Sequence, residues 1–97
     1  MNEYDRLNRI AKGLRERYPE GTRVELVDMC DIHAVPSGTR GTVRCVDDMA
    51  TIHVDWDNGS TLGVAYGEDH CRKLTQEEIE EEQLSDNDFE MRMWGDN

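Results

Sequence analysis

Three short segments in the middle of the chain alternate apolar and polar residues, and this alternation constrains the fold more than any other feature. They are residues 23–27, 42–46 and 51–56. Each places its apolar side chains on one face, as a half-buried β-strand does, so Arg23 and Glu25 are expected to face solvent. The pair Asn58-Gly59 follows the third segment and favours a type I′ turn, because both residue types accept positive φ angles. A hairpin into a fourth strand, residues 61–65, is therefore predicted.

A brief fifth strand is predicted at residues 71–74. The connection between the first two strands, residues 28–41, is long for a hairpin and contains Pro36-Ser37-Gly38, which makes it a candidate functional loop. Five short strands with one long early loop are typical of a small barrel. We therefore expect a mainly β fold, a five-stranded SH3-like β-barrel over residues 20–74, with Trp56 in its core.

The first segment, residues 1–19, is predicted to form an amphipathic helix. Its apolar residues recur at spacings of three and four: Tyr4, Leu7, Ile10, Ala11, Leu14 and Tyr18. Asn2 is a suitable N-cap, and Pro19 is expected to end the helix near residue 17. The same segment gathers five basic side chains: Arg6, Arg9, Lys12, Arg15 and Arg17.

The last segment, residues 75–97, holds most of the negative charge. It contains nine acidic side chains and one basic side chain, which is −8 of the net charge of −11. Thr75 and Glu78 match a capping box, so an acidic helix is predicted through about Gln83, followed by a polar tail. Such charge repels a phosphate backbone and favours basic surfaces, so we expect a protein partner rather than direct contact with nucleic acid.

This acidic helix and tail supply the residues that we expect to bind the partner. They are Glu77, Glu78, Glu80, Glu81, Glu82, Asp86, Asp88, Phe89 and Trp94. Phe89 and Trp94 restore apolar character after the acidic run, so they either dock on the chain itself or anchor a partner. Three interpretations of the glutamates remain open: a solvated surface, a decoy that imitates phosphate spacing, or a clasp on the basic N-terminal helix.

The sequence offers no assembled acid, base and nucleophile, so an enzyme is not expected. Four aspartates are explained as turn or surface residues rather than as a cation site or hydrolytic pair: Asp47, Asp48, Asp55 and Asp57. No stretch approaches the roughly 18 apolar residues of a membrane span. Because the N-terminus also lacks the regions of a signal peptide, a cytoplasmic protein without a membrane partner is expected.

The cysteines are the other residues with possible chemistry. Cys30, Cys45 and Cys71 are expected to be reduced and buried. Two of them lie near histidines, in Cys30-Asp31-Ile32-His33 and His70-Cys71, and the sequence leaves open whether these four meet around a metal. Adjacent ligands are sterically awkward, so no metal and no other cofactor is expected.

Residues 21–74 resemble a family known as domain of unknown function 4314, found in phages and other bacterial mobile elements. The resemblance rests on four stretches, residues 21–24, 36–43, 46–48 and 53–60. This region also looks like the small SH3-like repeats of some ubiquitin ligases, which share its glycine-threonine-valine and tryptophan-aspartate pattern. The resemblance implies a barrel fold and supplies no catalytic motif, and it does not extend to the acidic helix after Leu74.

Two function hypotheses follow. The first is a non-enzymatic inhibitor or adaptor from a mobile element that binds a basic, nucleic-acid-handling host protein, such as a CRISPR-associated nuclease, by mimicking DNA. The second is a nucleic-acid-binding barrel whose basic N-terminal helix contacts phosphate and whose acidic tail competes for that helix.

Overall fold

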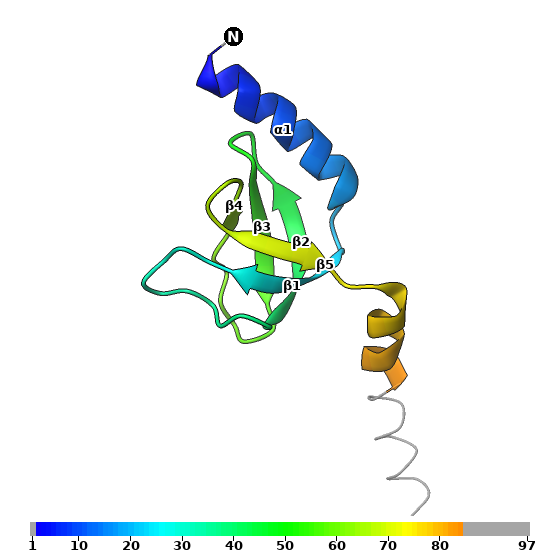
Figure 1. Ribbon diagram of the computed structural model, residues 1–97. Coiled ribbons are helices and arrows are strands. Elements are labelled where there is room, and N and C mark those ends of the chain that lie inside the picture. The colour runs from blue at the N-terminus through cyan, green and yellow to red at the C-terminus, as the bar shows by residue number, and fades with distance from the viewer. Residues whose placement is uncertain (1, 85–97) are drawn as a thin grey trace, which may run out of the picture.

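The computed structural model describes residues 2–84 and shows a five-stranded sheet with one helix at each end (Figure 1). The elements are α1 (Glu3–Arg17), β1 (Arg23–Asp28), β2 (Arg40–Val46), β3 (Thr51–Trp56), β4 (Val64–Ala65) and β5 (His70–Lys73). A second helix, called the C-terminal helix below, occupies residues 76–84 of this range. The predicted mainly β fold with five strands and two flanking helices is confirmed. Neither helix is both long and apolar enough within residues 2–84 to cross a lipid bilayer.

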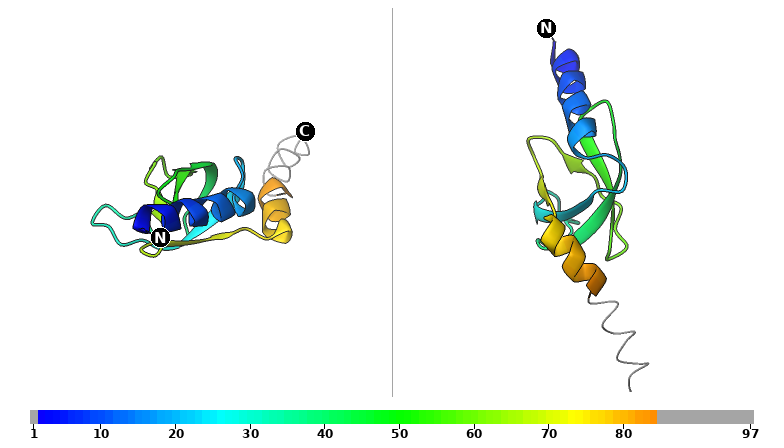
Figure 2. Two further views of the ribbon diagram at one scale, coloured as in Figure 1. Left: turned by 90° about the horizontal axis from the view of Figure 1, so that it is seen from above. Right: turned by 90° about the vertical axis from the view of Figure 1, so that its right-hand side faces the viewer.

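The strands are ordered β4-β3-β2-β1-β5, and every neighbouring pair is antiparallel. Strand β1 therefore lies between β2 and β5, with Glu25 opposite Arg40 on one side and opposite Arg72 on the other. Strands β4 and β5 are the two edges, so hydrogen bonds do not close a barrel between them in this part of the chain. The sheet nevertheless curves around a single core (Figure 2).

The predicted alternation in β1, β2 and β3 places apolar side chains in that core. The core members from these three strands include Val24, Leu26, Val43, Ile52, Val54 and Trp56. Trp56 is 3% exposed, and its indole N–H donates to the carbonyl of Leu62 over 2.8 Å. Gly41 allows the strands to pack this closely, because a Cβ there would lie 2.7 Å from Val54 Cγ1 and 2.8 Å from Trp56 Cε3.

Helix α1 begins and ends where the sequence predicts. Asn2 caps it, since the Asn2 side chain accepts a hydrogen bond from the Asp5 amide over 2.8 Å. Ala11 and Leu14 are buried against the sheet, whereas Tyr4, in the first turn, is 56% exposed. In Figure 1 and in the right view of Figure 2, α1 and the C-terminal helix lie at opposite ends of the sheet.

The turn after β3 differs from the predicted type I′ hairpin. Only Gly59 has a positive φ, of +93°, whereas Asn58 has a negative φ and accepts a hydrogen bond from the Ser60 amide through its side chain. The Gly59 and Trp56 backbones bond as in a type I turn followed by a left-handed glycine. Strand β4 is only two residues long, and the carbonyl of Leu62, two residues before it, accepts the hydrogen bond from the indole of Trp56.

The long connection between β1 and β2, residues 29–39, folds back on the sheet. Val35 is buried, and the Leu26 backbone bonds to both Thr39 and Gly38. The Cys30 amide donates to the Asp69 carboxylate over 2.7 Å, which ties the loop to the turn before β5. Ile32, near the tip, is 93% exposed.

Candidate functional site

The C-terminal helix starts at the predicted capping box. The Thr75 amide donates to Glu78 Oε1 over 2.9 Å, and the Glu78 amide donates to Thr75 Oγ1 over 3.1 Å. Because two otherwise unpaired amides are satisfied in this way, the helix has a defined first residue directly after β5. Its direction relative to the sheet is therefore set only two residues beyond the last strand.

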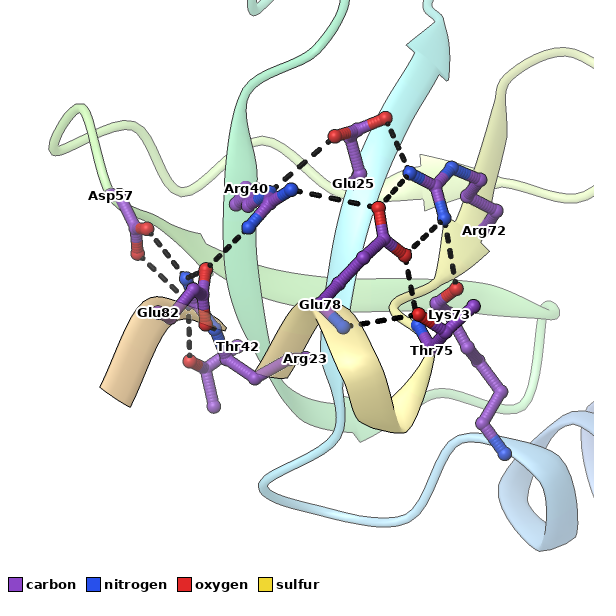
Figure 3. A network of polar contacts seen from close by, with 10 residues as sticks. All are labelled: Arg23, Glu25, Arg40, Thr42, Asp57, Arg72, Lys73, Thr75, Glu78 and Glu82. Carbon is purple, nitrogen blue, oxygen red and sulfur yellow. Dashed lines mark hydrogen bonds and ion pairs between the residues drawn. The ribbon is translucent and has the colours of Figure 1, made fainter. Parts of the chain in front are cut away.

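Two carboxylates fix the inner face of this helix to the outer face of the sheet (Figure 3). Both oxygens of Glu78 accept hydrogen bonds from Arg72, over 2.8 Å and 2.7 Å. Both oxygens of Glu82, one helical turn later, accept hydrogen bonds from Arg23, over 3.2 Å from Nε and 2.8 Å from Nη2. Bidentate pairs between guanidinium and carboxylate groups are among the strongest polar contacts in proteins.

Arg40 lies between these two pairs and contacts both helix carboxylates. Its Nη1 donates to Glu82 over 3.1 Å, and its Nη2 lies 3.6 Å from Glu78. Glu25 then bridges Arg40 and Arg72, over 3.4 Å and 3.0 Å. The register explains this row, because Glu25 is the cross-strand neighbour of both arginines. Arg23, Arg40 and Arg72 are called the arginine cluster below.

Arg23 is the most fully bonded member of the cluster. Besides Glu82, it donates to both oxygens of Asp57, over 3.0 Å and 2.8 Å, and to Thr42 Oγ1 over 3.1 Å. Its five guanidinium N–H groups thus have five acceptors. Its side chain is 22% exposed, so solvent screens these contacts less than it screens ordinary surface pairs.

The cluster keeps the helix carboxylates ionised. Hydrogen bonds from Arg72 and from the Thr75 backbone lower the pKa of Glu78 to about 2. Hydrogen bonds from Arg23, and then from Arg40, lower the pKa of Glu82, although partial burial opposes them. The pKa of Arg72 is raised by the same pairing with Glu78. The helix is therefore held by full charges throughout the physiological pH range.

These contacts correct the expectation that Arg23 and Glu25 face solvent. Both point away from the core, as predicted, but the C-terminal helix covers them and each side chain is only 22% exposed. The alternation in β1 shows which side chains share a face, but not that a helix 50 residues later covers that face.

The C-terminal helix does not form the clasp on α1 that was one of the three interpretations. Two of its carboxylates, Glu78 and Glu82, pair instead with the arginine cluster, at the opposite end of the sheet from α1 (Figure 1). The rest of the acidic tail, residues 85–97, lies outside the described residues. On α1, Arg6 pairs with Glu3, and Arg15 pairs with Asp48. Within residues 2–84 the other basic side chains of α1 form no ion pair: Arg9, Lys12 and Arg17.

The expected partner-binding residues fall into three groups. Glu78 and Glu82 lie on the inner face of the helix and are partly buried. Glu77, Glu80 and Glu81 are exposed, and these three are called the outer acidic face below. The remaining expected residues lie outside the described residues: Asp86, Asp88, Phe89 and Trp94.

A separate pocket of about 280 Å³ opens between α1 and the segment that runs from β4 through the following turn to the start of β5. Its walls are mainly apolar and include Leu14, Tyr18, Ile52, Val64, Tyr66 and Cys71. Burial raises the pKa of the Cys71 thiol to about 11, so it is protonated at neutral pH and is a poor nucleophile.

The expectation that all three cysteines are buried is wrong. Cys30 and Cys45 are exposed, and Cys71 is partly buried. Cys45 is exposed because a bulge in β2, between Val43 and Cys45, shifts the register after Arg44. Among residues 2–84, no group of three or more histidine, cysteine or acidic side chains is arranged to hold a metal ion. His70 instead bonds to Asp28 over 2.7 Å.

The arginine cluster and Glu25 were not among the residues that the sequence singled out. A weak signal was present, because Arg23 and Glu25 alternate on the polar face of β1, and Arg72 lies in the short strand before the acidic helix. Recognising the site also required the strand order, which brings residues from β1, β2 and β5 together.

Comparison with known proteins identifies a family model that matches the chain. None of the curated proteins compared with the chain matches it. The family model described as domain of unknown function (DUF4314) matches residues 7–74, which includes most of α1 in addition to the residues that carried the resemblance. The match contains the whole arginine cluster and ends immediately before the capping box of the C-terminal helix. Because this match covers more than half of the chain, the chain belongs to the DUF4314 family.

Proposed function

We propose that this protein is a non-enzymatic binding protein of a mobile genetic element that acts in the cytoplasm on a basic, nucleic-acid-handling host protein. It serves as an inhibitor or adaptor, and a CRISPR-associated nuclease blocked by DNA mimicry is one partner of suitable chemistry. The residues assigned to binding are the outer acidic face and the acidic and apolar residues that follow it: Glu77, Glu80, Glu81, Asp86, Asp88, Phe89 and Trp94.

The observation that carries this proposal is the division of the C-terminal helix into two faces. Glu78 and Glu82 fix the inner face to the arginine cluster through bidentate hydrogen bonds (Figure 3). The outer acidic face is then held at helical spacing on a support that does not need to be ordered by the partner. Carboxylates preorganised in this way favour a surface rich in lysine and arginine, where phosphate would otherwise bind.

The proposal is tested with the full-length chain carrying E77Q, E80Q and E81Q together. The host partner is first identified by affinity purification with the wild-type protein, and its binding is then measured by calorimetry. Each substitution removes one negative charge, keeps nearly the same size, and breaks no described ion pair. The affinity is expected to fall at least about tenfold near physiological salt, and its salt dependence is expected to weaken.

A matched control changes three exposed glutamates outside the C-terminal helix, E16Q, E20Q and E68Q. These three have no ion pair within residues 2–84. This control has the same net charge as the test variant, so it measures the general effect of charge. If both triple variants lose the same affinity, or if the outer-face variant binds like wild type, the outer acidic face is not the binding surface.

A second candidate function is supported by three basic side chains of α1 that form no ion pair within residues 2–84, Arg9, Lys12 and Arg17. These three side chains are exposed and can contact phosphate groups, as the nucleic-acid-binding hypothesis requires. This function predicts that R9Q, K12Q and R17Q together reduce binding of a DNA or RNA strand. The same variant leaves the affinity for the host partner unchanged if only the first function holds.

A further inference from the structure

The arginine cluster is an anion-binding surface that is already occupied by carboxylates of the same chain. Three guanidinium groups from adjacent strands converge on two carboxylates, Glu78 and Glu82, through five hydrogen bonds and one longer ion pair (Figure 3). Guanidinium forks that bind carboxylates in this geometry bind phosphate oxygens in the same way. The helix therefore occupies the positions that phosphate groups would take.

The local charge changes sign when the helix is removed. On the sheet, the three arginines face two carboxylates, Glu25 and Asp57, which leaves one net positive charge. Glu78 and Glu82 add two negative charges, so the covered surface has one net negative charge. A surface whose sign depends on the position of one short helix can bind anions only when that helix leaves it.

The arginine cluster and its cover also belong to different parts of the chain. Arg23, Arg40 and Arg72 all lie inside the family match, whereas Glu78 and Glu82 lie after its end at residue 74. The cover is thus an extension of the family domain. The surface beneath it has a ligand-binding chemistry that is complete without the extension, because all three arginines come from the sheet.

We propose that the arginine cluster is a binding site for the phosphate backbone of a nucleic acid, and that the C-terminal helix covers this site as an internal competitor. The helix follows β5 after two residues, so its effective concentration at the site is high. A ligand that displaces the helix must then offer more negative charges than its two carboxylates. A nucleic-acid strand meets this requirement, because it carries one full charge per nucleotide.

A strand bound at this site is contacted through its backbone rather than its bases. Among the tryptophans and tyrosines within residues 2–84, Trp56 is buried in the core, Tyr4 and Tyr18 lie in α1 and at its C-cap, and the exposed Tyr66 lies in the pocket region near α1. Within this part of the chain, none of them offers a stacking platform beside the arginine cluster. Binding is expected to depend little on sequence and strongly on salt.

The experiment uses the full-length chain with E78Q and E82Q, and a fluorescent DNA strand of about 15 nucleotides as the probe. Glutamine at position 78 still completes the capping box, so the helix can form without its charge. Fluorescence anisotropy at low salt is expected to show at least about tenfold tighter binding than wild type. Adding R40Q and R72Q to the same variant is expected to return the affinity to the wild-type value.

The control is E20Q with E68Q, which removes the same number of charges from exposed positions without a described ion pair. It is expected to change the affinity for the strand by less than about threefold. Circular dichroism checks that each variant is folded. A synthetic peptide of residues 75–84 provides a second measurement, because it should displace the strand from the E78Q/E82Q protein at the uncovered arginines.

The proposal is overturned if E78Q/E82Q binds the strand no more tightly than E20Q/E68Q, or if its gain survives R40Q and R72Q. A further test compares two displacing agents, an unlabelled DNA strand and a polyglutamate peptide with as many residues as the strand has nucleotides. The proposal is also overturned if both displace the labelled strand at the same concentration, because the site would then favour an acidic protein segment. The site is independent of the proposed function. The outer acidic face can fail to bind a protein partner while the uncovered cluster still binds DNA.

Discussion

Arg23 and Glu82, 59 residues apart in the sequence, form a side-on bidentate pair on the outer face of the sheet. The pair joins the first residue of β1 to the second turn of the C-terminal helix, so it connects the family domain to the segment that follows it. Arg23 also holds Asp57, directly after β3, through two further bonds. A single guanidinium therefore fixes both a strand connection and a helix.

Replacing Arg23 with glutamine is expected to lower the free energy of unfolding by about 1 to 3 kcal/mol, because Glu82 and Asp57 would keep their charges without this partner. Urea denaturation followed by circular dichroism measures this change. Arg44→Gln is the control, since Arg44 is half exposed and its one ion pair within residues 2–84 is with Asp55. It should lose no more than about 1 kcal/mol. Equal losses for the two variants would show that the contacts of Arg23 are no stronger than those of a surface pair.

Acid is expected to release the C-terminal helix. The pKa of Glu78 is about 2 in the folded protein and near 4.5 when the pairing is lost, so its contribution to docking is complete above pH 4.5. That contribution falls as the pH decreases from 4.5 towards 2. NMR amide signals of residues 76–84 should therefore shift towards coil values over this interval.

The matched variant for this titration is Arg72→Gln, which removes the largest cause of the lowered pKa of Glu78. Its helix signals should shift at a higher pH than those of wild type, because Glu78 would protonate closer to its ordinary value. If the wild-type helix stays docked below pH 2, or if the two proteins titrate together, carboxylate pairing does not hold the helix.

Much of the fold follows from local sequence patterns. The alternation around Val24, Val43 and Ile52 predicts three strands, because a period of two identifies a half-buried strand without tertiary information. The limits of α1 follow from Asn2 and Pro19, and the start of the C-terminal helix follows from Thr75, because capping is also local. These features need no knowledge of which strands are neighbours.

The arginine cluster could not be predicted in the same way. Its members are 17 and 32 positions apart, and they meet only because β1 lies between β2 and β5. The charge count predicted an acidic helix that would pair with basic side chains. In the sequence, the closest grouping of such side chains is the five basic residues of α1. The C-terminal helix pairs with the arginine cluster instead, because it starts two residues after β5 and α1 lies at the far end of the sheet (Figure 1).

Gly41 is expected to tolerate no side chain. A Cβ at this position would meet Val54 Cγ1 at 2.7 Å and the Asp55 carbonyl oxygen at 2.9 Å, and neither can move without disturbing β3. Gly41→Ala should therefore lower the free energy of unfolding by about 1 to 3 kcal/mol in a thermal melt. Gly13→Ala on α1 should instead raise it by up to about 1 kcal/mol, since nothing lies within 4 Å of that Cβ. The changes in the free energy of unfolding must have opposite signs in the two variants, and equal signs would contradict the prediction.

The three cysteines are expected to react at different rates with a thiol reagent at pH 8. Cys30 and Cys45 are exposed, whereas burial raises the pKa of Cys71 to about 11, so Cys71 has far less of the reactive thiolate. Site-resolved mass spectrometry should show Cys71 modified at least about tenfold more slowly than Cys45. In guanidinium chloride all three rates should converge, because the burial of Cys71 is lost. Rapid labelling of Cys71 in the folded protein would mean that the pocket between α1 and the sheet opens freely, and that the packing of Leu14 and Tyr18 against it is weak.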